Sequence, residues 1–392
     1  MNGELLTRGV EKIYPTREAL EKELQSGKKL RIYQGFDPTG PKLHLGHMVG
    51  LLKLKQWQKL GHKVIFLVGD ITATIGDPSG KTTARKMLSK EEVIKNAKNY
   101  IQQAGKILDF AGKNPVEIRY NIEWYGKMNA LEFARIAHFL TYSQVIERDL
   151  FREREKSGQD IFVNEFFYPL LQAYDSVAMN VDLEVGGNDQ MFNMMMGRKL
   201  MRNMLHKEKF VMTTPLLVDT AGKKIGKTEG NVIALDSDPN ELFGMIMNLS
   251  DDIIAKCFEL LTEVPMAEIE EMEKEMPGKL NPRDAKIRLA KEIVTLLFGV
   301  EAADKAAAEF EKVFSRKELP ENIAEIELSG TFPLPQFLLE LRLVSSNSEA
   351  RRLISAGAVE IDGARCGDHK ATISTHSGMI IKVGKRRFAK IK

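Results

Sequence analysis

Two histidines, His44 and His47, occur in the sequence HLGH within the stretch YQGFDPTGPKLHLGHMVG (33–50). Their spacing lets both imidazoles face the same way around the first turn of a helix, and Gly46 between them leaves room for a nucleotide to approach the backbone. Imidazole N–H groups beside a phosphate would stabilise charge that develops during phosphoryl or nucleotidyl transfer. On spacing alone, two solvated loop histidines remain the alternative. A zinc pair is a weaker interpretation because the zincin pattern HExxH is absent.

The segment GDPSGKTTAR (76–85) contributes two more cations, Lys81 and Arg85, after a predicted strand. It resembles a P-loop, but its two glycines are too close together for that motif. We therefore interpret it as a polar turn, and we retain Lys81 and Arg85 as candidate phosphate contacts.

The segment GKKIGKTEGN (222–231) places Lys224 and Lys227 among glycines. A glycine-rich segment can move, and lysines carried on it can close over a triphosphate. A lone run of this kind is more often a solvated loop, so its interpretation depends on the motifs that accompany it.

Three polar residues, Tyr168, Gln172 and Asp175, are spaced so that they share one face of a predicted helix. The neighbouring stripe of this helix is apolar and contains Val163, Phe166, Phe167, Leu170, Leu171, Tyr174 and Val177. The polar face could form one wall of a binding pocket. Taken alone, it would more often be an ordinary solvated stripe beside the core.

The elements that must position these side chains form a β-α-β unit, with a predicted strand at 30–36, a helix at 46–61 and a second strand at 63–70. A right-handed crossover between parallel strands is half of a doubly wound nucleotide-binding sheet, which places ligands in the loop between strand and helix. Another predicted strand, at 181–187, leads into a helix, so the sheet resumes after a helical insertion at about 89–180. The predicted fold class is α/β, with a Rossmann-like parallel sheet.

The rest of the chain divides by composition. Residues 1–235 are predicted to form the catalytic domain, and 236–318 show the helical spacing of an α-helical domain. Turn-forming residues make 319–335 the predicted linker to a last domain at 336–392. From Ser346 to Lys392, ten Lys and Arg residues accompany four Asp and Glu residues. That balance suits a polyanionic partner, and a solvated face is the alternative.

The overall composition, 43% hydrophobic and 28% charged, is that of a soluble globular protein. Only two cysteines occur, far apart in sequence, so cysteine supports neither a disulfide framework nor a four-ligand zinc site. The amino terminus lacks the apolar run of a secretory signal, and no run is long enough to cross a membrane. We expect a cytoplasmic protein without a membrane partner.

HLGH, the later KIGKT and the β-α-β frame together resemble the signatures of class I aminoacyl-tRNA synthetases. The motifs YQGFDPT, IGDPSGK, FFYPLLQAYDS and GGNDQ, in this order, are similar to those of the bacterial tyrosyl branch of that class. NSEARRLISAGAVEIDG with GKRRFAKI resembles the ribosomal-protein-type RNA-binding module at the end of those enzymes, so the resemblance covers the whole chain. It implies L-tyrosine, ATP and tRNA(Tyr) as substrates, and a homodimer that pairs through the helical insertion.

The resemblance also implies roles for residues that would hold tyrosine. Asp175 and Tyr33 would hydrogen-bond the phenolic hydroxyl. The α-ammonium group would be held by Asp77, Tyr168, Gln172 and Gln190. Phenylalanine would leave the carboxylate and the phenol of the protein unpaired, which is costly in a closed pocket.

For ATP and the adenylate, the resemblance assigns a second set of residues. Those on the ribose and amino-acid side are Asp37, Gly187 and Asp189, and those at the phosphates are Thr39, His44, Gly46 and His47. The tyrosine carboxylate is already ionised at neutral pH, so its attack on the α-phosphorus needs no protein nucleophile or base. Cationic stabilisation would come from Lys81, Arg85, Lys224 and Lys227, with Mg²⁺ on the phosphates and no metal ligands assigned to the protein. The candidate tRNA contacts are Arg351, Arg352, Arg386 and Arg387.

Two departures and two alternatives accompany the resemblance. Gln34 stands where many relatives have a cysteine beside the ribose, and Pro169 inside the specificity helix is expected to remove a hydrogen bond and to kink the helix. One alternative is a catalytically silent synthetase-like RNA-binding protein, which the retained histidines, loop lysines and acidic pocket residues disfavour. The other is a tryptophanyl enzyme, which Tyr33 and Asp175 disfavour.

Overall fold

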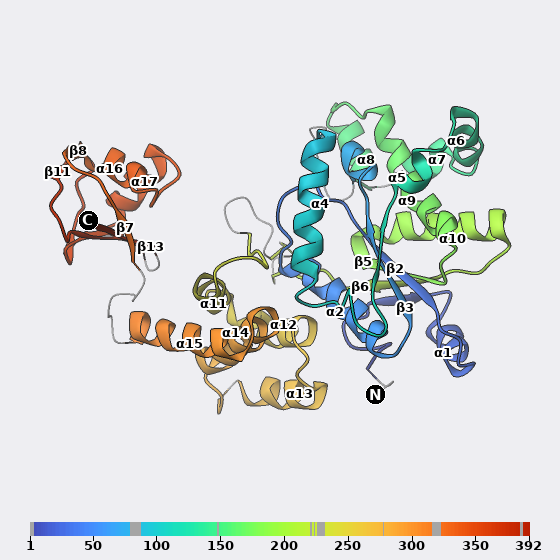
Figure 1. Cartoon of the computed structure of the whole chain (residues 1–392), viewed down its shortest axis with the longest axis horizontal. Helices are drawn as coiled ribbons and strands as arrows, with labels where there is room; N and C mark the ends of the chain where they lie inside the picture. Colours follow the sequence, from blue (N-terminus) through green and yellow to red (C-terminus); the bar gives the residue numbers. More distant parts are fainter. Residues whose placement is uncertain are drawn as a thin grey trace. The chain divides into compact units, whose positions relative to one another are not determined.

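The computed structural model describes residues 4–78, 88–146, 149–219, 222, 224–225, 232–276, 278–315, 323–384 and 387–392. The chain forms two compact units, Met1–Asp304 and Lys305–Lys392. Each is considered by itself below (Figure 1).

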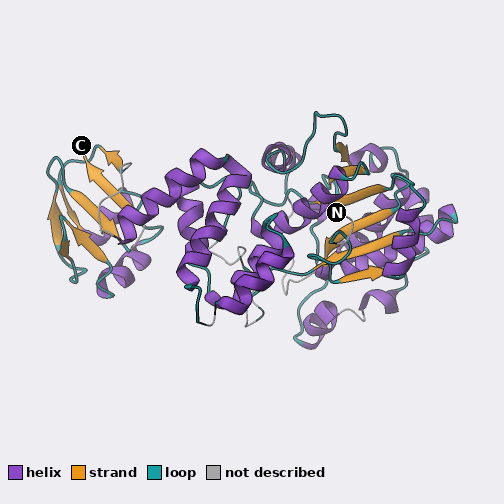
Figure 2. Ribbon diagram, turned by 90° about the horizontal axis from the view of Figure 1, so that it is seen from below, coloured by secondary structure: helices purple, strands orange, loops and turns teal. Residues whose placement is uncertain are grey.

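A six-stranded sheet is the centre of the first unit (Figures 1 and 2). In spatial order its strands are β1 (Lys12–Tyr14), β6 (Phe210–Thr214), β5 (Leu183–Gly187), β2 (Arg31–Phe36), β3 (Lys63–Val68) and β4 (Glu117–Tyr120). The strands from β6 to β4 are parallel, and β1 adds an antiparallel edge. The crossovers reverse between β2 and β5, which confirms the predicted doubly wound sheet. β3 is apolar almost throughout because helices cover both faces of such a sheet.

The helices around the reversal point follow from the sequence pattern. The helix after β2 is α2 (Leu45–Lys59), and the one after β5 is α10 (Met191–Leu205), preceded by the 3₁₀ turn η2 (Asn188–Gln190). A short helix, α3 (Thr72–Ile75), follows β3. α10 packs against α9 (Phe167–Ala178) through a buried cluster that includes Leu170, Ala173, Val177, Met196 and Leu200. The carboxyl end of β2 and the amino end of α9 lie close together, because Tyr168 donates a hydrogen bond to Asp37.

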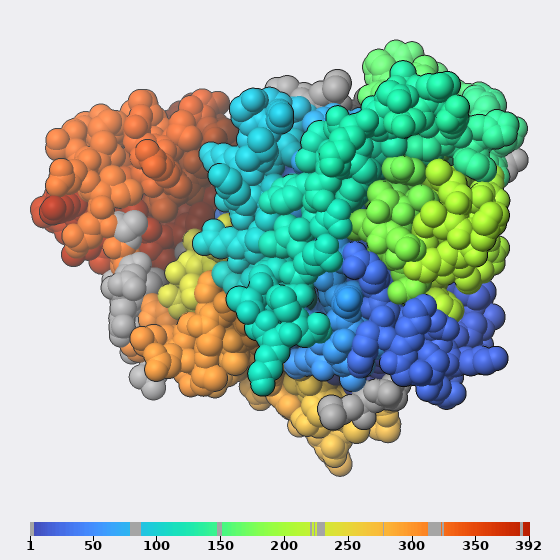
Figure 3. All heavy atoms as spheres, turned by 45° about the vertical axis from the view of Figure 1, so that its right-hand side comes forward, coloured from blue at the N-terminus to red at the C-terminus, as the bar shows by residue number. Residues whose placement is uncertain are grey.

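The segment predicted as a helical insertion contains a strand that the sequence did not indicate. Its helices are α4 (Lys90–Ala104), α5 (Ile122–Tyr125), α6 (Ala130–Ala137), α7 (Tyr142–Ile146), α8 (Asp149–Lys156) and the 3₁₀ turn η1 (Val163–Phe166). β4 interrupts them and pairs in parallel with β3, so the prediction of continuous helix is wrong at 117–120. Four residues at a sheet edge are too few to reveal a period of two. Figure 3 shows the teal and green surface of this segment covering much of the first unit in that view.

Pro169 does not break a helix interior, contrary to the sequence expectation. It is the third residue of α9, whose buried face continues to Val177. Backbone N–H groups in the first turn of an α-helix have no acceptor within that helix, so proline costs little there. Tyr168, Gln172 and Asp175 accordingly share one continuous helix.

Residues after 235 continue the first compact unit. Its helices there are α11 (Pro239–Met247), η3 (Asp251–Ile253), α12 (Ile254–Leu261), α13 (Met266–Glu275) and α14 (Pro282–Phe298), and α15 (Val300–Ser315) follows. The predicted domain boundary at 235 does not separate two compact units. The sheet and the helices up to Asp304 form one unit, in which α12 packs on α2. No helix in the described ranges has the length and apolar character needed to cross a membrane.

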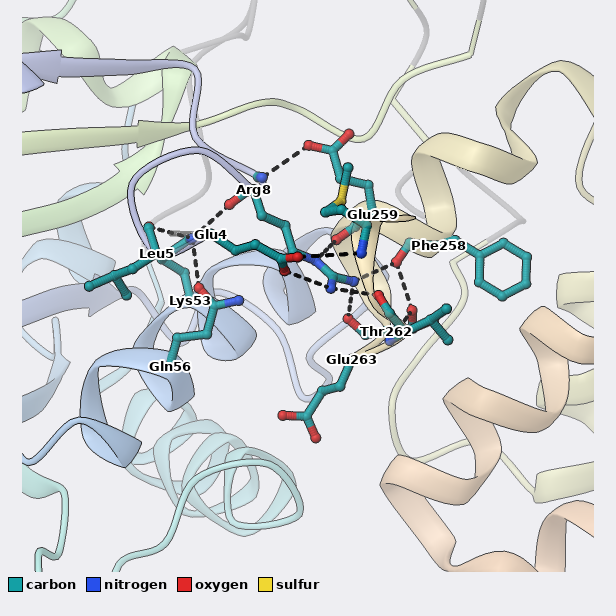
Figure 4. A network of polar contacts seen from close by, with 12 residues as sticks. Glu4, Leu5, Arg8, Lys53, Gln56, Phe258, Glu259, Thr262 and Glu263 are labelled. Carbon is teal, nitrogen blue, oxygen red and sulfur yellow. Dashed lines mark hydrogen bonds and ion pairs between the residues drawn. The ribbon is translucent and has the colours of Figure 1, made fainter. Parts of the chain in front are cut away.

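A buried polar network joins the amino-terminal segment to α12 and α2 (Figure 4). The guanidinium of Arg8 donates to four carbonyl oxygens at the end of α12, those of Phe258, Glu259, Thr262 and Val264, at 2.6–3.1 Å. Lys53 of α2, 3% exposed, donates to the carbonyl oxygens of Leu5 and Arg8 and to the side chain of Gln56. Carbonyls that α12 cannot pair internally thus receive a donor from the amino-terminal segment.

This network predicts a pH-dependent stability. Burial, with Arg8 acting in the same direction, lowers the pKa of Lys53 from 10.5 to about 7. Between about pH 7 and pH 10 the unfolded chain binds this proton and the folded chain does not, so this group makes the folded chain more stable as the pH rises. From about pH 7 to pH 9, the unfolding free energy of the wild type should gain about 2 kcal/mol relative to that of Lys53→Met. Denaturant unfolding of both proteins at the two pH values measures this gain, and parallel pH profiles would contradict it.

The second unit contains two small sheets and two helices. Its larger sheet has the spatial order β10 (Ala364–Arg365), β9 (Val359–Ile361), β12 (Ile380–Val383), β13 (Arg387–Ile391) and β7 (Ala324–Ile326). The smaller sheet pairs β11 (Thr372–Ser374) with β8 (Thr331–Pro333), and the helices are α16 (Leu334–Glu340) and α17 (Asn347–Ser355). The core between them includes Phe337, Leu338, Ile354, Ile381 and Ala389.

The linker predicted at 319–335 is wrong for its described part beyond 323. β7 pairs in parallel with β13, and β8 pairs with β11, so both strands belong to the second unit. Each strand is only three residues long, and the segment around them contains Pro320, Gly330, Pro333 and Pro335, which is why the sequence favoured a linker. Residues 319–322 lie outside the described part of the chain.

Candidate active site

A cavity lies at the carboxyl ends of β2 and β5, where a doubly wound sheet binds its ligands. It is lined by all the described residues that the sequence predicted for tyrosine or ATP: Tyr33, Asp37, Thr39, His44, Gly46, His47, Asp77, Tyr168, Gln172, Asp175, Gly187, Asp189, Gln190 and Lys224. The other three residues predicted for this site, Lys81, Arg85 and Lys227, lie outside the described residues. Segments far apart in the sequence therefore meet around one space.

The two histidines lie at the amino end of α2 and cap it. His44 is the N-cap residue, and its Nδ1 accepts a hydrogen bond from the backbone N–H of Gly46 at 3.1 Å. Nδ1 of His47 accepts from the backbone N–H of His44 at 3.1 Å. Because both Nδ1 atoms accept, the proton of each neutral ring is on Nε2, which can donate to a ligand. A Cβ on Gly46 would lie 3.0 Å from the His44 ring, so this glycine also makes room for the cap.

The segment after the predicted lysine loop lies beside the histidines. The backbone N–H of Leu45 donates to Ile233 O at 3.1 Å, and that of Leu235 donates to Leu43 O at 3.0 Å. Lys224 lies near the start of the same predicted loop. Its Nζ forms an ion pair with Asp189 at 2.7 Å, and both side chains are partly exposed. The two signature motifs of the sequence thus belong to one site.

Polar side chains in the middle of the cavity could hold a cationic group. Tyr168 Oη donates to Asp37 Oδ2 at 2.8 Å, and Gln190 Nε2 donates to Asp77 Oδ2 at 2.7 Å. Gln172 donates from Nε2 to Glu184 at 3.1 Å, and its buried Oε1 has no hydrogen-bond partner among the described residues. An ammonium group is the natural partner for such an acceptor beside two carboxylates.

Asp37 is fixed in place by contacts that the sequence did not indicate. Its Oδ1 accepts from Thr72 Oγ1 at 2.7 Å. A Cβ on Gly69 would lie only 2.1 Å from the same oxygen, so a larger residue there would displace the Asp37 carboxylate from this position. Thr72 and Gly69 are therefore supporting residues of the site.

Asp175 forms the deep end of the cavity and is 3% exposed. Its Oδ1 accepts from Trp124 Nε1 and from Tyr125 Oη, each at 2.9 Å. Burial raises the pKa of the Asp175 carboxyl well above its usual range, and these hydrogen bonds oppose that effect. Trp124 and Tyr125 come from the short helix α5, and no sequence pattern linked them to Asp175.

Tyr33 also has a partner within the protein. Its hydroxyl lies 2.8 Å from Ser176 Oγ, and the whole residue is buried. Tyr33 and Asp175 nevertheless both line the same cavity, so a ligand there can reach both.

The candidate tRNA contacts belong to the second unit. Arg351 and Arg352 are exposed on α17. Arg387 instead donates to Leu343 O at 2.6 Å and to Glu349 Oε1 at 2.9 Å. It therefore holds β13 against the first turn of α17. Hydrogen bonds from Ser345 and Arg387 lower the pKa of Glu349 to about 2. Arg386 lies outside the described residues.

Comparison with known proteins agrees with this geometry. The family model "tRNA synthetases class I (W and Y)" matches residues 25–315, and "Tyrosine--tRNA ligase SYY-like C-terminal domain" matches residues 309–391. The chain is 46% identical to the tyrosine–tRNA ligase of Carboxydothermus hydrogenoformans, over 99% of this chain and 97% of the relative. It is 44% identical to that of Thermotoga maritima, over 99% and 96%.

Solved structures show the same fold. A C-terminally truncated mitochondrial tyrosyl-tRNA synthetase from Aspergillus nidulans superposes with a TM-score of 0.68 at 25% identity, covering 79% of this chain and 93% of that one. The Archaeoglobus fulgidus enzyme complexed with L-tyrosine gives 0.62 at 25% identity, covering 78% and 98%. The fold, the site and these matches define a class I aminoacyl-tRNA synthetase. Within that class, the chain belongs to the tyrosine–tRNA ligase family.

Proposed function

We propose that the cavity activates L-tyrosine with ATP to tyrosyl-adenylate and pyrophosphate, and that the chain then transfers the tyrosyl group to the 3′ end of tRNA(Tyr). The observation that carries this proposal is the set of polar groups that line the cavity. A buried carboxyl and a buried phenol, Asp175 and Tyr33, share it with carboxylates, amides, two imidazoles and the partly exposed Lys224. Tyrosine with its hydroxyl at Asp175 and Tyr33 would direct its carboxylate toward the histidines.

The ammonium group of this tyrosine would be held by Asp77, Tyr168, Gln172 and Gln190. Gln172 supports the assignment because its buried Oε1 has no partner among the described residues. Asp77 and Gln190 are already hydrogen-bonded to one another, which orients both toward the cavity. The ribose would lie near Asp37, Gly187 and Asp189.

The chemistry needs positioning and charge stabilisation more than proton transfer. The substrate carboxylate is the nucleophile and is ionised at neutral pH. His44 and His47 present Nε2–H donors, with Thr39 nearby, where negative charge develops on the transferred phosphate. The ion pair with Asp189 keeps Lys224 at the same wall. Positioning of the reactants and stabilisation of charge are sufficient for this transfer.

Mg²⁺ would accompany the phosphates of ATP and supply Lewis-acid stabilisation there. In the described ranges, no group of three or more His, Cys, Asp or Glu side chains is placed to hold a metal ion. The donors facing the phosphates are imidazoles and a lysine, which suit the anionic oxygens themselves. We therefore assign Mg²⁺ to the nucleotide and not to a resident protein site.

Exchange of labelled pyrophosphate into ATP tests the activation step. We expect exchange that requires tyrosine, and charging of tRNA(Tyr) by the same preparation. Exchange that requires tryptophan would favour the tryptophanyl alternative. The absence of any exchange, together with retained RNA binding, would favour the catalytically silent alternative.

Replacing Lys224 tests the phosphate end of the site. Lys224→Ala should lower kcat for adenylate formation by about 10- to 100-fold, because a cation that acts on developing charge is lost. Equilibrium binding of tyrosine should change little. Stopped-flow measurement of adenylate formation and calorimetric titration with tyrosine separate the two effects.

Lys291→Ala is the matched control for Lys224→Ala. Lys291 also pairs with an aspartate, Asp304, at 2.7 Å, but it lies on the surface of α14 away from the cavity. Its replacement should leave kcat unchanged. If tyrosine affinity fell as much as kcat in Lys224→Ala, Lys224 would belong to the tyrosine pocket instead.

We also propose that the chain forms a homodimer in the cytoplasm. Apolar side chains exposed in the insertion, Leu131, Tyr142, Phe162 and Val163, are each 54–67% exposed and would be covered by a second copy. Sedimentation of the wild type and of Leu131→Lys tests the assignment of this face, because a charge at a self-associating surface should favour the monomer.

A further inference from the structure

A buried ion pair reaches the wall of the cavity through Glu184, a lining residue that was assigned to neither substrate. Lys209, immediately before β6, is 0% exposed, and its ammonium pairs with Glu184 of β5, which is 2% exposed. Burying both charges is costly, and two apolar residues would often be at least as stable. A role beyond stability would account for the pair.

The ammonium of Lys209 has a second partner, the hydroxyl of Ser176 on α9, at 2.9 Å. The approach is possible because α10 carries Gly197 at this point. A Cβ there would lie 2.5 Å from Lys209 Nζ and 2.9 Å from Ser176 Oγ. Ser176 follows Asp175 directly, so the network touches the residue at the end of the cavity.

The chemistry of these groups limits the direction of their hydrogen bonds. An ammonium group only donates, so Ser176 Oγ accepts from Lys209. The single proton of Ser176 then has two acceptors, Tyr33 Oη at 2.8 Å and Glu184 Oε2 at 3.5 Å. Only the first distance is within the normal range for O–H···O. The shorter contact favours donation from Ser176 to Tyr33, which leaves the proton of Tyr33 for a group in the cavity. Donation from Tyr33 to Ser176, with Ser176 donating to Glu184, is the alternative that the test must separate.

We propose that Lys209 and Ser176 are positioning residues that make the hydroxyl of Tyr33 a donor toward the phenolic oxygen of the substrate. This inference rests on the proposed binding of tyrosine. Donation then runs in one direction, from Lys209 through Ser176 and Tyr33 to the substrate hydroxyl, whose own proton goes to Asp175. Phenylalanine offers neither an acceptor to Tyr33 nor a donor to Asp175, and both residues are buried. Lys209 and Ser176, the relay residues, thus contribute to selection of tyrosine without contacting it.

The test compares binding and activation of tyrosine and phenylalanine in relay variants. Ser176→Ala removes the donor to Tyr33 and keeps the ion pair, so the affinity for tyrosine should fall about tenfold while that for phenylalanine stays the same. Ser176→Thr keeps the hydroxyl and should restore most of the preference. Lys209→Met with Glu184→Gln leaves no unpaired buried charge and should reduce the preference to a similar extent. Because Glu184 also accepts from Gln172 of the ammonium site, which both amino acids would share, only the ratio of the two affinities is compared for this variant. Calorimetric affinities and kcat/KM from pyrophosphate exchange are both measured, with thermal unfolding as the check on folding.

Lys53→Met is the matched control, because it also removes a buried lysine Nζ with several acceptors, and Lys53 does not line the cavity. It should change stability and leave the ratio of tyrosine to phenylalanine affinities unchanged. The relay is refuted if folded Ser176→Ala retains the wild-type ratio, or if Lys53→Met lowers the ratio equally. A wild type that binds tyrosine no better than phenylalanine would refute the proposed function together with the relay.

Discussion

Asp175→Ala is expected to lower kcat/KM for tyrosine by about 100-fold or more and to leave that for phenylalanine within about threefold. The carboxyl is buried and accepts hydrogen bonds from Trp124 and Tyr125. Its removal leaves the indole N–H of Trp124 and the substrate hydroxyl without an acceptor, whereas Tyr125 can still donate to the carbonyl oxygen of Leu171. Each orphaned group costs about 1–3 kcal/mol. Pyrophosphate exchange at varied concentrations of each amino acid gives both values of kcat/KM.

Asp182→Ala is the control for this variant. Asp182 is likewise buried and accepts a hydrogen bond, from the backbone N–H of Arg31, but it is not part of the cavity. Its loss should lower the melting temperature and spare the preference for tyrosine. An unchanged preference in Asp175→Ala would falsify the assignment of the phenol-binding end.

The sequence was sufficient for the parts of the site that lie on local motifs. HLGH predicts a helix amino terminus with two imidazoles on one side, and the structure has α2 begin there. The spacing of Tyr168, Gln172 and Asp175 predicts one helix face, and all three line the cavity. In each case the determining pattern lies within one turn or one helix, where geometry follows directly from residue spacing.

The parts that escaped prediction depend on contacts between distant segments. Trp124 and Tyr125 reach Asp175 across about fifty residues of sequence, from a four-residue helix with no periodicity of its own. Glu184 lies on β5, and Lys209 comes immediately before the neighbouring strand β6. Only their burial distinguishes these two residues from surface charges. β4, β7 and β8 were missed because strands of three or four residues carry too little pattern.

The positions of small residues show how packing changes the meaning of a motif. The sequence assigned Gly46 to the approach of a nucleotide, yet a Cβ there would already meet the ring of His44. Gly197 was assigned no role, although a side chain there would collide with Lys209 and Ser176. A glycine in a motif can therefore be required by contacts with the protein's own side chains, whether or not a ligand approaches it.

Truncation after Ser315 is expected to separate the two half-reactions. Adenylate formation needs only the cavity of the first unit, so pyrophosphate exchange should stay within about twofold of the full-length value. Transfer needs a tRNA held by the protein, and phosphate contacts supply much of such binding. Charging should therefore fall by about 100-fold at about 150 mM salt. The cut falls at the end of α15 and before β7, so it removes both sheets of the second unit and divides neither.

A full-length variant distinguishes lost charge from lost structure in this experiment. Arg351→Gln with Arg352→Gln changes two exposed side chains of α17, whereas Arg387 is left intact because it holds Glu349 and the Leu343 carbonyl. This variant should keep full exchange activity, bind tRNA more weakly, and lower the slope of log affinity against log salt by about one to two. Equal losses of exchange and charging in the truncated chain would mean that the second unit supports the catalytic fold. An unchanged salt slope in the arginine variant would mean that these two arginines do not contact tRNA phosphates.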